Sequence, residues 1–104
     1  MFGNMLGKLQ EAQEKMKEVQ ERLDSVSVKG EAGNGEVEVI VSGSKQIKDV
    51  SIAQSLIDRG DHEEVEDKVL MALKQAMEKA ENVAKSESGD LMKGVLPNIP
   101  GLNL

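Results

Sequence analysis

Apolar side chains recur at alternating intervals of three and four residues through the first quarter of the chain. In order, they are Phe2, Met5, Leu9, Ala12, Met16, Val19, Leu23 and Val26. This heptad spacing predicts a long α-helix over about residues 3–25 that meets another helix along a narrow seam. At its longest, from residue 1 to residue 26, such a helix would measure about 39 Å.

The next part of the chain changes to strict alternation, which is typical of β-strands. Residues 25–31 read SVSVKGE and residues 36–42 read EVEVIVS, with Asn34-Gly35 between them as a hairpin turn signal. A second turn at residues 42–45 leads to a third strand over 46–53. Ile47 is out of phase with Val50 and Ile52 in that strand, which predicts a bulge or a late start. The segment is expected to form a three-stranded antiparallel meander with a valine-rich face that needs a cover.

A second helix is expected to begin at Asp61 after a connector over residues 54–60. Asp61 as N-cap and Glu64 three residues later match a capping box. A broad apolar stripe follows, formed by Val65, Val69, Ala72, Leu73, Ala76, Met77, Ala80, Val83 and Ala84. We expect it to pack on the valine face and to end near residues 85–89.

These elements predict an α+β fold: a long N-terminal helix, a three-stranded antiparallel meander and a C-terminal helix. Residues 1–88 are expected to form one domain, and residues 89–104, which contain both prolines, a flexible tail. One sheet and one helix cannot cover the whole seam of the first helix. A homodimer is therefore expected.

Several classes of site are excluded by composition. The chain has no Cys, Trp or Tyr and a single Phe, which excludes disulfides, thiolate chemistry, cysteine zinc sites and aromatic platforms for single-stranded nucleic acid. No run is apolar enough for a membrane span or signal peptide, so we expect an intracellular, soluble protein. His62 is the single imidazole and no nucleophile motif accompanies it. We therefore expect no catalytic residues, no metal and no cofactor.

The acidity of the chain is local. Of 19 acidic residues, five lie in residues 61–67, which leaves 14 against 13 basic residues elsewhere. Lys8, Lys15 and Arg22 recur every seven residues along one flank of the apolar seam of the first helix. A nearly neutral remainder with a line of cations is compatible with a basic surface.

The order of these features resembles the YbaB/EbfC family of bacterial nucleoid-associated proteins. The resemblance covers residues 1–88 and is most specific in Val28-Lys-Gly30-Glu-Ala-Gly33-Asn-Gly35-Glu-Val37-Glu-Val39. Gly43, Val50-Ser-Ile52, Ser55-Leu56-Ile57, Glu63–Val69, Ala72 and Gln75-Ala76 follow in the family order. The resemblance implies a tweezer-like homodimer with joined sheets and projecting long helices. It also implies binding of duplex DNA, a cytoplasmic nucleoid location and no catalytic activity.

We therefore expect a nucleoid-associated DNA-binding homodimer that contacts phosphates with weak sequence preference, in nucleoid organisation or gene regulation. The candidate DNA-binding residues are Lys8, Lys15 and Arg22, followed by Lys17, Lys79 and Lys85. The alternative is a non-enzymatic adaptor dimer whose helices clamp a protein partner. The acidity of the chain and the apolar segment 89–104 favour that alternative.

Overall fold

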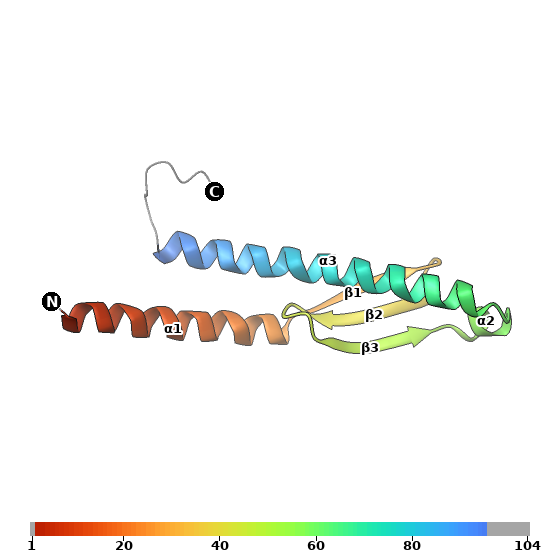
Figure 1. Ribbon diagram of the computed structural model, residues 1–104, viewed down its shortest axis with the longest axis horizontal. Helices are drawn as coiled ribbons and strands as arrows, with labels where there is room; N and C mark the ends of the chain where they lie inside the picture. Colours follow the sequence, from red (N-terminus) through yellow and green to blue (C-terminus); the bar gives the residue numbers. More distant parts are fainter. Residues whose placement is uncertain (1, 96–104) are drawn as a thin grey trace.

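The computed structural model describes residues 2–95, which form an elongated molecule of 68 × 27 × 16 Å. Its elements are α1 (Phe2–Ser25), β1 (Ser27–Ala32), β2 (Val37–Ser42), β3 (Ile47–Ile52), α2 (Gln54–Asp58) and α3 (His62–Val95). Helix α3 lies along one face of the sheet and continues past its end, where it runs antiparallel to α1 (Figure 1). The predicted α+β order of helix, antiparallel sheet and helix is confirmed.

The heptad seam of α1 is covered over only part of its length. Val19 and Leu23 are buried near the sheet, whereas Met5, Leu9 and Met16 are each about 60% exposed (64%, 59% and 61%). The helix has the predicted bounds because its backbone hydrogen bonds are made within the helix, whether or not its apolar seam is covered. Within one chain, however, the seam meets other elements only at its C-terminal end.

The sheet has the predicted meander order β1-β2-β3, with antiparallel pairing throughout. The turn between β1 and β2 places Gly33, Asn34 and Gly35 at φ of 63°, 55° and 87°. Glycine and asparagine tolerate this left-handed region, which explains the hairpin signal. Between β2 and β3 the register passes from Ile40↔Asp49 to Val41↔Ile47, so the predicted irregularity at Ile47 is confirmed as a bulge.

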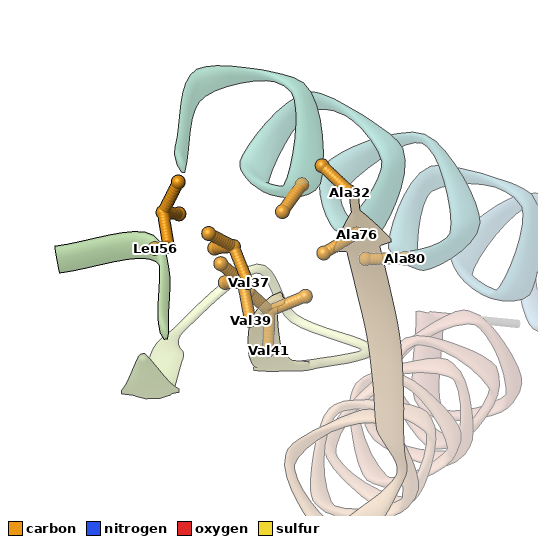
Figure 2. Close-up of a cluster of buried hydrophobic side chains, with 8 residues drawn as sticks. Ala32, Val37, Val39, Val41, Leu56, Ala76 and Ala80 are labelled. Atoms are coloured by element: carbon orange, nitrogen blue, oxygen red, sulfur yellow. The ribbon is translucent and has the colours of Figure 1, made fainter. Parts of the chain in front are cut away.

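The core lies between α3 and the first two strands. Val37, Val39 and Val41 of β2 are fully buried against Ala76, Ala80 and their helical neighbour Ala72, as predicted (Figure 2). Because alanine side chains are short, α3 approaches the sheet closely. A Cβ placed on Gly30 of β1 would lie 1.9 Å from the carbonyl oxygen of Ala72.

The connector between sheet and helix contains an unpredicted helix, α2, whose Leu56 is fully buried in the core. Asp61 caps α3 as predicted, since its Oδ1 accepts hydrogen bonds from the backbone N–H groups of Glu63 and Glu64 at 3.1 and 3.2 Å. The Glu64 carboxylate, expected to close the capping box, accepts hydrogen bonds from Arg59 and Lys68 instead.

Helix α3 continues to Val95, so the predicted end at residues 85–89 is wrong. Gly89 does not end the helix, because one glycine costs a helix only about 1 kcal/mol relative to alanine, and no proline occurs before residue 97. Residues 89–95 of the predicted flexible tail are therefore helical, and residues 96–104 lie outside the described residues. Within residues 2–95, no helix is both long and apolar enough to cross a membrane.

Candidate nucleic-acid interface

The densest cluster of acidic side chains is confined to one end of the molecule. The five acidic residues of segment 61–67 lie around the start of α3, at one end. The beginning of α1 and the end of α3 lie together at the opposite end (Figure 1). We call this end, formed by residues 2–18 of α1 and 81–95 of α3, the helical arm. The arm is thus the part of the molecule where the acidic cluster repels a polyanion least.

The predicted row of cations follows the side of α1 that is turned toward α3. Arg22 bonds Glu87 of α3 through Nε and a terminal nitrogen, both at 3.1 Å from the carboxylate oxygen. A seven-residue step rotates a helix position by only about 20°, so Lys15 and Lys8 continue this line along the arm. Both lysines are exposed, and neither forms an ion pair with a residue whose side chain the structure describes.

The other candidate cations fall into two groups. Lys17 and Lys85 are exposed on the arm and, among the described side chains, have no ion-pair partner within 4.0 Å. Lys79 lies over the sheet, where its Nζ donates a hydrogen bond of 2.8 Å to the backbone carbonyl of Lys29. The structure thus gathers Lys8, Lys15, Lys17 and Lys85 on the arm, and gives Arg22 and Lys79 intramolecular partners that the sequence did not indicate.

The two edges of the sheet differ in their cover. At β1, the Gln75 side chain accepts a 2.8 Å hydrogen bond from the Glu31 N–H, and the Lys79 ammonium donates a hydrogen bond to the Lys29 carbonyl. Residues of α3 therefore satisfy backbone groups at the β1 edge. All six residues of β3, by contrast, are exposed.

The uncovered part of β3 is apolar and faces the same way as the core. Ile47, Val50 and Ile52 pair with Val41, Val39 and Val37, and directly paired residues share a face of the sheet. They remain 37–55% exposed because α3 lies over β1 and β2. Sequence alternation predicted this valine-rich face, but it did not predict that α3 would leave β3, one of the three strands, uncovered.

Four charged side chains join the hairpin turn to the start of α3. Arg59 bonds Glu36 at 2.7 Å and Glu64 at 2.6 Å, and Lys68 bonds the same two carboxylates at 3.0 and 3.3 Å. We call these residues the junction cluster. Hydrogen bonds from Lys68 and then Arg59 lower the pKa of Glu36, and a hydrogen bond from Arg59 is the main cause that lowers the pKa of Glu64.

The junction cluster predicts a pH dependence of stability. Because the folded pKa of Glu36 lies below its ordinary value near 4.5, the unfolded chain binds more protons between these two pKa values. Its stabilising contribution is complete above about pH 4.5 and is lost as the pH falls through the lowered pKa. We expect Glu36→Gln to reduce Tm at pH 7 and to flatten the fall in Tm between pH 5 and pH 3, measured by circular dichroism.

The matched control for this prediction is Glu14→Gln on α1. Glu14 is exposed and forms no ion pair with a described side chain. Its replacement should leave both the Tm at pH 7 and its acid dependence nearly unchanged. Equal pH profiles for the wild type and Glu36→Gln would show that the junction cluster does not couple folding to pH.

His62 lies in a shallow depression of about 430 Å³ between α2 and the start of α3, which Ile57, Gly60, Asp61, Val65 and Glu66 also line. The lining is mainly apolar, with two carboxylates at its border. No group of three or more potential metal-ligating side chains occurs within the part of the chain that the structure describes.

Known proteins resemble the chain over nearly its whole length. A nucleoid-associated protein of Caldanaerobacter subterraneus subsp. tengcongensis is 37% identical, over 97% of this chain and 89% of the relative. A nucleoid-associated protein of Agrobacterium fabrum is 38% identical, over 96% and 92% respectively. The crystal structure of an uncharacterized protein from Helicobacter pylori has the same fold, with a TM-score of 0.80 at 21% identity over 88% of this chain and 97% of that one.

The profile of the YbaB/EbfC DNA-binding family matches residues 1–95, which extends the resemblance seen in the sequence through the end of α3. The match includes the helical arm, the meander and the close contact of α3 with Gly30. With relatives above 30% identity along most of the chain, the assignment does not depend on one motif. The chain belongs to the YbaB/EbfC DNA-binding family.

Proposed function

We propose that the protein is a homodimer that binds duplex DNA through phosphate contacts of its helical arms, with weak sequence preference and without catalysis. This proposal assigns it to the cytoplasm, on the nucleoid. The observation that carries it is the helical arm itself: four lysines without described ion-pair partners lie at the end opposite the acidic cluster.

The open face of β3 supports the homodimer. Ile47, Val50 and Ile52 form an apolar surface continuous with the core valines, and burying apolar surface contributes about 25 cal/mol per Å². A second copy of β3 presents the same apolar chemistry, so a two-fold axis can bring the two patches together. Joined in this way, two chains project two pairs of helices.

Phosphate binding explains why lysines are the main candidates. Lys8, Lys15, Lys17 and Lys85 can each place a point charge beside a phosphate oxygen and release a condensed counterion. Arg22 must leave Glu87 to do the same, and Lys79 must leave the Lys29 carbonyl, so their contributions are expected to be smaller. Among its described residues, the arm exposes more Glu and Lys than Asn and Gln, and residues 2–18 and 81–95 contain no Arg, the residue that most often reads guanine, which favours weak sequence preference.

The test is fluorescence anisotropy with a labelled duplex, titrated at about 50 and 200 mM salt, the range in which phosphate-driven binding weakens steeply. We expect saturable binding by the wild type. The variant Lys8→Gln/Lys15→Gln should bind more weakly, with a salt dependence shallower by up to about 0.9 for each lost phosphate contact.

A control variant, Lys29→Gln/Lys74→Gln, removes the same charge from the sheet and from the part of α3 that covers it. It should bind nearly as the wild type does. Equal loss in both variants would show that net charge rather than the arm determines binding. Absence of wild-type binding at the lower salt concentration would overturn the proposal and favour the adaptor role.

A further inference from the structure

The apolar stripe of α1 remains open where the helix projects. Leu9 and Met16 continue the line of the buried Leu23 at seven-residue steps, and Met5 lies beside them. Their 59–64% exposure contrasts with 8% at Leu23. The stripe therefore passes from a covered to an uncovered environment along one helix.

The structure also shows where the chain leaves α3 relative to this stripe. The ion pair between Arg22 and Glu87 shows that these two residues lie at the same height along the antiparallel helices α1 and α3. The eight residues from Glu87 to Val95 advance α3 by about 12 Å, which brings its end level with α1 near residue 14. The segment that follows Val95 thus starts close to Met16, and the open stripe extends about 16 Å further, to Met5.

The segment 96–104 suits this surface in length and chemistry. Its sequence, LPNIPGLNL, contains four large aliphatic residues and no charged side chain. Nine residues span at most about 30 Å, which exceeds the length of the open stripe. The two prolines restrict the chain before docking and so reduce the entropy lost when it becomes ordered.

We propose that residues 96–104 dock on the open stripe of α1 in their own chain, along Met5, Leu9 and Met16. A segment tethered this closely has an effective concentration in the millimolar range, so even weak apolar contacts keep it bound against a free partner. The proposal is independent of DNA binding, and its test contains no DNA.

The test uses the full chain, which has no native cysteine to interfere with labelling. Asn98→Cys carries a nitroxide spin label, and the methionine methyl groups are observed by NMR. We expect the label to broaden the methyl signal of Met5, at the far end of the stripe, whereas Met16 lies so close to the end of α3 that it is broadened in any case and serves as a positive reference. Met71 is equally exposed, at 61%, but lies 24 residues before the end of α3, about 36 Å away, and should stay sharp.

Two further samples separate the possible occupants. Ile99→Asn/Leu102→Asn, added to the labelled variant, should restore a sharp Met5 signal because it deletes two apolar anchors of the segment. A mixture of spin-labelled chains with isotope-labelled chains lacking the nitroxide should show sharp Met5 and Met16 signals. Broadening of Met5 confined to the mixture would assign the stripe to another copy, and absence of Met5 broadening in every sample would leave the segment undocked. Either result would overturn the proposal.

Discussion

Replacing Gly30 by alanine should cause one of the largest losses of stability available from a single methyl group in this protein. The new Cβ would lie 1.9 Å from the carbonyl oxygen of Ala72 and 2.5 Å from the backbone nitrogen of Ala76. Both obstacles are backbone atoms of α3, so the helix must move away from the sheet and open the contact between its alanines and the β2 valines. We expect a cost of about 3 kcal/mol or more, at the upper end for overpacked cores. At about 4 °C per kcal/mol, Tm should fall by roughly 12 °C or more.

Gly7→Ala provides the matched control, because beyond the adjoining residues and the surrounding helix backbone no heavy atom lies within 4 Å of its added Cβ. Alanine is favoured over glycine in a helix by up to about 1 kcal/mol, so this variant should be as stable as the wild type or slightly more stable. Thermal unfolding followed by circular dichroism distinguishes the two substitutions. A Gly30→Ala protein with wild-type Tm would mean that α3 does not approach β1 as closely as described.

Val50→Lys should convert the proposed dimer into a monomer. Val50 is 47% exposed in the single chain, so a lysine can be solvated there without disturbing the fold. In a dimer joined through β3, two lysines would be buried without partners. An uncompensated buried charge costs about 3–5 kcal/mol, which corresponds to at least a hundredfold increase in the dimer Kd.

Ser51→Lys is the control for this prediction. Ser51 is the next residue of β3, is exposed, and pairs with Glu38 on the opposite face of the sheet. Analytical ultracentrifugation should give a dimer for Ser51→Lys and a monomer for Val50→Lys, with equal helical circular dichroism for both. If both variants remained dimeric, the interface would lie away from the apolar face of β3.

Features determined by local periodicity could be predicted from the sequence. The bounds of α1, the Asn34-Gly35 turn and the cap at Asp61 each depend on a few consecutive residues. The irregularity at Ile47 was also visible, because one residue out of phase must either bulge or start the strand late. The valine face was expected to pack on the apolar stripe of α3, and it does.

What the sequence did not indicate depends on where elements lie in space. The cover of β1 and exposure of β3 follow from the line of α3 across the sheet, which alternation cannot specify. The Arg22–Glu87 ion pair joins residues 65 positions apart, so the sequence around Arg22 could not predict it. The family relationship, in contrast, was visible in the order of glycines and valines from Val28 to Val39. The fold needs a glycine at each of these positions, either for the close approach of α3 or for a positive φ in the turn.

The hydrogen bonds that Gln75 and Lys79 form along β1 also limit how far these sheets can assemble. A sheet with two free edges can add strands indefinitely and grow into a fibre. Here one edge already has backbone groups occupied by side chains of α3, so strands can be added readily only beside β3. If the two chains of the proposed dimer also pair their β3 edges, the outer edges of the combined sheet are both the occupied ones. Growth of the sheet would then end at two chains.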